Sequence, residues 1–189
     1  MSESMNRRDA MGIAFGACAA VGGVFALAGM KKAWDPLPSV KAAGTTTVDV
    51  STAEANVLYT EKWRGKPVFI IKKTAEMIAS SSEDSKKRDV VIGSDHYLVC
   101  IGLCTHLGCI PSYNPAKAIS KETSNDSFAC ACHGAGFNGA GINTKAPAPL
   151  PMLIPEFKIA DGKIIIGEAG PEYEKMKADG VLGETPLKA

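Results

Sequence analysis

Two short segments that carry cysteine and histidine constrain the fold of this chain more than any other feature. Residues 104–109 read Cys-Thr-His-Leu-Gly-Cys, and residues 130–135 read Cys-Ala-Cys-His-Gly-Ala. Each segment offers a thiolate and an imidazole two or three positions apart, and together they supply a Cys2His2 set: Cys104, His106, Cys130 and His133. Such a set binds either a [2Fe–2S] cluster, with two thiolates on one iron and two imidazoles on the other, or a structural zinc ion.

The first segment resembles the C-T-H-L-G-C loop of the Rieske iron–sulfur subunit of cytochrome bc quinol oxidoreductases. This resemblance implies one Rieske [2Fe–2S] cluster per chain, bound by the four side chains named above. It also implies a disulfide between Cys109 and Cys132, which would join the two loops. A structural zinc site has no need of a second cysteine pair, so these two residues favour the cluster.

Two further segments bear on the same family. Residues 146–149, Ala-Pro-Ala-Pro, resemble its proline loop, which covers the cluster. The second ligand loop departs from the family pattern, because Ala131, Ala135 and Phe137 stand where proline, serine and tyrosine are usual. In the family, the hydroxyl groups of this serine and this tyrosine donate hydrogen bonds that raise the reduction potential of the cluster. Without them we predict a potential low in the Rieske range and a low-potential quinol such as menaquinol, unless backbone N–H groups compensate.

The resemblance also implies a mechanism of quinol oxidation. The imidazole of His133 is expected to accept a hydrogen bond from the quinol hydroxyl, with His106 as the second exposed ring. Reduction of the bound iron raises the proton affinity of the imidazole, so one electron and one proton leave the quinol together. Leu107 matches the family leucine that packs at the quinol pocket.

The amino-terminal segment predicts a membrane location. Arg7 and Arg8 precede an uncharged stretch, residues 10–30, which as a helix would span about 31 Å and could cross a bilayer once. The arginine pair resembles a twin-arginine signal, which exports folded domains that already hold their cofactor; a chance pair before an ordinary anchor is the alternative. Residues 26–28, Ala-Leu-Ala, also suit signal peptidase. We expect a retained single-pass anchor in a bacterial inner membrane, with a cytoplasmic amino terminus and a periplasmic head.

The rest of the chain predicts a mainly β head, an antiparallel Rieske-type sandwich with a cluster-binding subdomain. The expected strands are short runs rich in Val, Ile and aromatic residues: 48–51, 67–73, 96–103, 157–160 and 163–166. Asp161-Gly162 suits the type I′ turn of a hairpin between the last two. Residues 74–82 predict one short helix with Thr74 as N-cap, followed by a solvated loop.

These patterns divide the chain into four parts. We expect a signal and anchor, a flexible hinge linker, a Rieske domain and a polar, draped or mobile tail: residues 1–32, 33–46, 47–170 and 171–189. The cluster-binding part of the Rieske domain covers about residues 100–150. The linker would let the head move between a quinol site and a haem.

The expected function is electron transfer within a quinol:cytochrome c oxidoreductase. Its partners would be cytochrome b and c-type cytochrome subunits, quinol and the membrane, within a dimeric complex. A formal net charge of +1 gives no basic surplus for nucleic acid. The alternatives are the Rieske small subunit of a periplasmic molybdenum oxidase such as arsenite oxidase, a Rieske ferredoxin or dioxygenase component, and a zinc protein.

Three features stay without an assigned role. Cys100 lies in an apolar run, where a free thiol is more often core packing than chemistry. Cys18 lies within the apolar amino-terminal stretch and is preceded by a poor lipoprotein signal. Residues 110–129 separate the two ligand loops and could form a surface contact.

Overall fold

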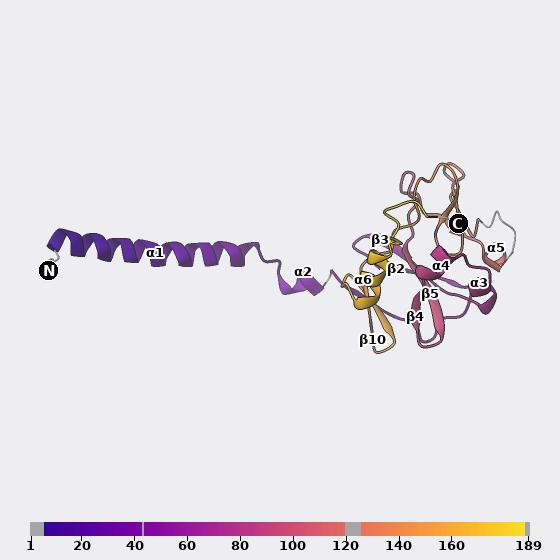
Figure 1. Ribbon diagram of the computed structural model, residues 1–189, viewed down its shortest axis with the longest axis horizontal. Coiled ribbons are helices and arrows are strands. Elements are labelled where there is room, and N and C mark those ends of the chain that lie inside the picture. Colours follow the sequence, from indigo (N-terminus) through magenta and orange to yellow (C-terminus); the bar gives the residue numbers. More distant parts are fainter. Residues whose placement is uncertain (1–5, 43, 120–125, 188–189) are drawn as a thin grey trace. The chain divides into compact units, whose positions relative to one another are not determined.

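The computed structural model describes residues 6–42, 44–119 and 126–187 (Figure 1). The chain divides into two compact units, one ending at Ala42 and the other beginning at Ala43. The central part of the 110–129 segment, residues 120–125, lies outside the described residues.

The amino-terminal unit is helical. Helix α1, Arg7–Trp34, has 28 residues, and none of them is buried against other described residues. By length and composition it is long and apolar enough to cross a membrane, as expected from the sequence. A second helix, α2 (Pro38–Ala42), occupies part of the segment that we expected to be an irregular linker. Its first residue is a proline, which is well tolerated in the first turn because the missing N–H has no helical partner there.

The described residues of the second unit form three antiparallel sheets, which confirms the predicted mainly β architecture. The first has the order β1 (Thr46–Asp49), β11 (Lys163–Ile166), β10 (Phe157–Ala160). The second has the order β2 (Leu58–Trp63), β3 (Lys66–Lys72), β5 (Asp95–Ile101), β4 (Val90–Ile92). The third has the order β6 (Ser112–Tyr113), β7 (Phe128–Ala129), β8 (Gly136–Phe137), β9 (Asn143–Lys145).

The hairpin of β10 and β11 forms as predicted. Phe157 pairs with Ile166 and Ala160 pairs with Lys163, so the two turn residues are Asp161 and Gly162. Both have positive φ, 51° and 71°. Positive φ at both central positions is the signature of the type I′ turn, whose twist suits a two-residue hairpin.

The short helices confirm one prediction and correct another. Helix α3 (Ala75–Ala79) begins after Thr74, whose hydroxyl accepts a hydrogen bond from the Met77 N–H at 3.3 Å, as the predicted N-cap should. The following segment was expected to be a loop, but it forms helix α4 (Glu83–Lys87). Its N-cap serine, its acidic first turn and its basic last turn stabilise a helix that has almost no apolar face. Along the chain, helix α5 (Pro115–Ile119) falls between the two ligand loops.

The carboxy-terminal segment is part of the core, which corrects the expectation of a draped or mobile tail. It forms helix α6 (Pro171–Ala178), in which Met176 is buried. Val181 and Leu182 beyond the helix are also buried. Tyr173 packs edge-on against Phe157, with ring centroids 6.1 Å apart. A few apolar residues in a polar segment were therefore enough to dock it on the first sheet.

Two apolar cores lie on opposite faces of the second sheet. Along β5, Tyr97, Val99 and Ile101 belong to one core, whereas Leu98 and Cys100 belong to the other. Neighbouring strand residues point to opposite faces, so β5 reads as a continuous apolar run because both of its faces are covered. Cys100 is thus a packing residue, as predicted.

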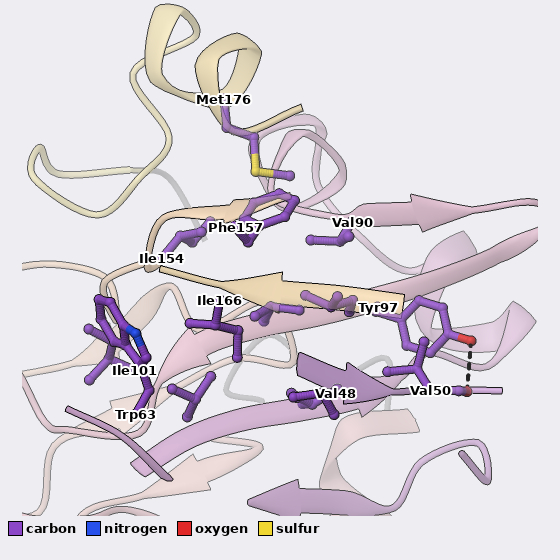
Figure 2. Packing of buried hydrophobic residues seen from close by; sticks show 14 of the residues in the cluster. Val48, Val50, Trp63, Val90, Tyr97, Ile101, Ile154, Phe157, Ile166 and Met176 are labelled. Atoms are coloured by element: carbon purple, nitrogen blue, oxygen red, sulfur yellow. Dashed lines mark hydrogen bonds between the residues drawn. The ribbon is translucent and has the colours of Figure 1, made fainter. Parts of the chain in front are cut away.

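The first core joins the first two sheets and helix α6. Figure 2 shows Met176 over the ring of Phe157, and the Tyr97 hydroxyl hydrogen-bonded to the Val50 carbonyl at 3.4 Å. Val48 and Ile166 belong to the same core. The second core joins the second and third sheets, and it includes both ligand loops through Cys104 and Cys130. The ligand loops are therefore supported by the packed side chains of the second core.

Candidate metal centre

The first ligand loop is a tight turn that directly follows strand β5. The Cys104 N–H donates to the Cys109 carbonyl at 2.7 Å, and the Gly108 N–H donates to the Cys104 carbonyl at 2.8 Å. Gly108 has a φ of 82°, a conformation that residues with a Cβ rarely adopt. The two hydrogen bonds close the loop and leave His106 and Leu107 at its tip.

The second ligand loop joins strands β7 and β8 and repeats the same backbone pattern. The Cys130 N–H donates to the Ala135 carbonyl at 2.8 Å, and the Gly134 N–H donates to the Cys130 carbonyl at 2.9 Å. Gly134 has a φ of 78°. The tip of this loop carries Cys132 and His133, both exposed.

The cysteines of the two loops fall into two classes. Cys104 and Cys130 are buried free thiols. Cys109 and Cys132 form a disulfide that joins the loops, as the family resemblance implied. The sulfur atoms of Cys109, Cys130 and Cys132 lie within 4.8 Å of one another. Since Cys109 and Cys132 are oxidised, Cys104 of the first loop and Cys130 of the second are left as thiols that can bind a metal.

The two histidines meet across the loops. The ring centroids of His106 and His133 are 4.7 Å apart, and the ring planes make an angle of 85°. The Nδ1 atom of His106 is buried and has no hydrogen-bond partner among the described residues. A buried ring nitrogen without a partner is costly, and a bond to a metal would satisfy it. Two buried thiols and such an imidazole fit a Cys2His2 cluster.

Two backbone N–H groups interact with one of these thiols. Burial raises the pKa of the Cys104 thiol, whereas hydrogen bonds from the backbone of His106 and Leu107 lower it. A metal ligand must be a thiolate, and N–H groups directed at the sulfur stabilise that charge. Ala135, at the end of the second loop, and Phe137, two residues later, are both buried, but neither side chain has a hydrogen-bond donor.

The proline segment lies against the first ligand loop. The Thr105 hydroxyl donates to the Leu150 carbonyl at 2.6 Å, and the Asn143 amide donates to the Ala148 carbonyl at 3.1 Å. Ala148 is buried in the second core together with the ligand cysteines. Sequence reasoning missed both Thr105 and Asn143, although Thr105 stands inside the ligand motif.

Two large apolar side chains are exposed at or near the first ligand loop. Leu107 is 71% exposed at the tip of that loop, and Ile110 is 63% exposed just beyond its last residue. Single exposed apolar residues are common on protein surfaces, so Leu107 is a candidate contact residue only because of its place at the tip of a ligand loop.

A family model agrees with this geometry. The model described as the Rieske [2Fe-2S] domain matches residues 49–158. The chain belongs to the Rieske family. It therefore carries a Rieske [2Fe–2S] cluster, and the structural zinc site considered from the sequence is set aside.

Curated relatives match over most of this Rieske chain. The ubiquinol-cytochrome c reductase iron-sulfur subunit of Rickettsia felis is 34% identical over 176 residues, which are 88% of this chain and 96% of the relative. The subunit of the same name from Bradyrhizobium diazoefficiens is 37% identical, with 85% and 94% covered. The mitochondrial cytochrome b-c1 complex subunit Rieske of Schizosaccharomyces pombe is 35% identical, with 80% and 67% covered.

A solved structure shows the same fold. A chain of a hyperthermophilic respiratory Complex III aligns with a TM-score of 0.55 and 28% identity, over 81% of this chain and 98% of that one. Together with the relatives, it places this protein among the Rieske iron–sulfur subunits of cytochrome bc1 complexes. The amino-terminal apolar helix fits a single-pass membrane anchor in such a complex.

Proposed function

We propose that this Rieske subunit takes electrons from a membrane quinol and passes them to a c-type cytochrome. The observation that carries the proposal is the pair of imidazole rings held edge to face between two disulfide-linked loops, with the Nδ1 of one ring buried and unpartnered. When bound, the cluster supplies a one-electron acceptor at this point. Its ligands are two thiolates and two imidazoles: Cys104, Cys130, His106 and His133.

The exposed residues of the loop tips handle the substrate. His133 accepts a hydrogen bond from the quinol hydroxyl and then takes its proton, with His106 as the second ring. Imidazole suits this step because the pKa of an ordinary histidine side chain lies near neutral pH and responds to a neighbouring charge. The side chain of Leu107, which is exposed at the tip of the first loop, contacts the apolar quinone ring.

The second ligand loop selects a low-potential donor. Ala135 and Phe137 replace the two hydroxyl donors of the family, so the reduced cluster receives less stabilisation there. We place the midpoint potential in the lower part of the range of roughly −150 to +300 mV for Rieske centres. Menaquinol suits that potential better than ubiquinol does. The names of the relatives from Rickettsia and Bradyrhizobium include ubiquinol. Those names describe the relatives and do not identify the quinol that this chain uses.

The subunit works at a membrane surface. Helix α1 anchors it, Arg7 and Arg8 hold the amino terminus in the cytoplasm, and the Rieske domain lies in the periplasm. The arginine pair also directs export of the folded domain through the twin-arginine route. The partners are cytochrome b and a c-type cytochrome in a dimeric complex that couples quinol oxidation to proton translocation.

Turnover of the intact complex tests the electron route. Membranes that contain the full complex should reduce cytochrome c with a quinol as donor, faster with a menaquinol analogue than with a ubiquinol analogue. Complexes that carry the variant His133→Ala should show no such reduction. Equal rates in that variant would contradict the proposed route, and a preference for the ubiquinol analogue would contradict only the choice of quinol.

A redox titration followed by EPR tests the reason for that preference. The variants Ala135→Ser and Phe137→Tyr restore the hydroxyls, so the midpoint potential should rise in each. Phe157→Tyr is a matched control, because it adds a hydroxyl in the other core and should leave the potential unchanged. A midpoint that is already high and does not respond to either variant would mean that backbone donors compensate.

A further inference from the structure

A buried arginine outside the ligand loops connects three distant parts of the Rieske domain. Arg88 follows helix α4, and its side chain is completely buried. Its Nε donates to the Ala140 carbonyl at 2.9 Å and its Nη2 donates to the Met152 carbonyl at 2.5 Å. Its Nη1 donates to the Val181 carbonyl. One planar group thus holds three backbone segments in a fixed relation.

The charge of this arginine has no carboxylate partner within the described part of the chain. The neighbouring carboxylate, Asp89, uses one oxygen for the buried Lys73 ammonium and has the other 3.2 Å from Nδ1 of His96. Burial lowers the pKa of Arg88 to about 10, so the group is still a cation at neutral pH. Burying a cation that binds only carbonyls costs desolvation free energy. In return, the three directed hydrogen bonds of Arg88 fix three backbone segments relative to one another.

Two of these bonds close the base of the segment that carries the prolines. We call residues 140–152 the closing loop. Arg88 binds both of its ends, Ala140 and Met152, and the Met152 N–H donates to the Gly141 carbonyl at 2.8 Å. The closing loop is thereby pinned at its base.

The other side of the closing loop meets the ligand loops. Thr105 donates to the Leu150 carbonyl at 2.6 Å, and Ala148 and Met152 pack in the same core as Cys104 and Cys130. Movement at the base of the closing loop would therefore disturb the packing around the ligand cysteines.

The third bond brings in the carboxy-terminal segment. Beside Val181, the Leu182 carbonyl accepts from the Ile154 N–H at 2.8 Å. Gly183 has a φ of 99°, and a Cβ there would lie 2.8 Å from the Met152 carbonyl oxygen. The tail therefore runs tightly along the end of the closing loop and holds it from behind.

We propose that Arg88 is a positioning residue that holds the closing loop over the metal centre and so protects the bound cluster from water and chelators. The proposal rests on the ligand set given under the proposed function. It does not depend on the identity of the quinol, because protection acts in the resting subunit.

The test uses the full-length chain with its cluster, in detergent, and the variant Arg88→Lys. Lysine keeps the charge but cannot bind three carbonyls in one plane. Amide exchange within the closing loop should become about tenfold faster or more, the factor expected for losing one charge-assisted hydrogen bond. Bleaching of the visible cluster absorbance by a chelator should accelerate in parallel. Amides of the β10–β11 hairpin should exchange at the unchanged rate.

The matched control is Arg64→Lys, the same exchange at an exposed position in the turn between β2 and β3, and it should alter neither rate. Unchanged exchange in Arg88→Lys would overturn the proposal. Equal acceleration throughout the domain, hairpin included, would overturn it too, because Arg88 would then stabilise the fold in general.

A measurement on the unaltered protein keeps the proposal testable if Arg88→Lys does not fold. The amides of Met152 and Ile154 should then be protected as strongly as those of the β10–β11 hairpin. Exchange at the rate of an exposed loop would overturn the idea of a pinned base. A protein that shows this protection but binds no cluster would contradict the ligand set and leave the pinning intact.

Discussion

The two ligand loops have the same backbone and different side chains. Each is closed by one hydrogen bond from its first residue to its sixth and another from its fifth to its first, and each has a glycine with positive φ at the fifth position. The fourth position is Leu107 in one loop and His133 in the other, and the sixth is Cys109 in one and Ala135 in the other. Both loops therefore supply one imidazole and one disulfide cysteine, but at different positions of the same turn: the third position is His106 in the first loop and Cys132 in the second.

The largest effect is expected from removing an imidazole from either loop. His133→Ala and His106→Ala should each abolish the normal Rieske EPR signal, because a cluster iron would lose one of its two protein ligands. His96→Ala is the control, since it changes the remaining histidine of the chain, which lies in strand β5. A normal signal in either loop variant would mean that the two loops are not equivalent ligand donors.

A smaller loss should follow from separating the loops. Cys109→Ala removes the disulfide to Cys132, and losing a native disulfide typically costs about 2–5 kcal/mol. The temperature at which the full-length chain loses its visible cluster absorbance should fall clearly. Cys18→Ala, which changes an exposed free thiol in helix α1, should leave that temperature unchanged. If both variants behave alike, the disulfide does not hold the loops together.

The two turn glycines offer the sharpest test of equivalence. A Cβ at Gly108 or at Gly134 would meet no atom within 4 Å, so Gly108→Ala and Gly134→Ala should cost only the strain of a positive φ, about 1 kcal/mol each. Urea unfolding of the two variants side by side measures this. Costs that differ by more than about 1 kcal/mol would show that one loop is constrained by more than its own turn.

The smallest effect on stability is expected at the loop tip. Leu107→Ala changes a side chain that is 71% exposed, so unfolding should shift by less than about 0.5 kcal/mol. Quinol oxidation should nevertheless slow, since Leu107 contacts the substrate in our proposal. Ile110→Ala, at a similarly exposed position outside the tip, should leave the oxidation rate unchanged. Equal slowing in both would indicate a broad apolar contact and no specific role for the tip.

Local patterns predicted local structure well. The Asp161-Gly162 turn and the Thr74 cap were predicted correctly, because each depends on residues within a few positions of one another. The bringing together of the two loops was predicted from their resemblance to the Rieske family. Helix α4 was missed because it lacks an apolar face. The burial of Val181 and Leu182 was missed because a few apolar residues in a polar tail show no periodicity.

By itself, the sequence determined which residue types the two loops offer: a cysteine and a histidine in each, a further cysteine in each, and alanine and phenylalanine where the family usually has hydroxyls. Only the tertiary structure decided how that site is held. Arg88 binds carbonyls 52, 64 and 93 positions away along the chain, and no local pattern marks those carbonyls, because every residue has one. The physical reason is that ligand chemistry depends on residue type, whereas the position of a backbone carbonyl in space depends on the packing of the whole domain.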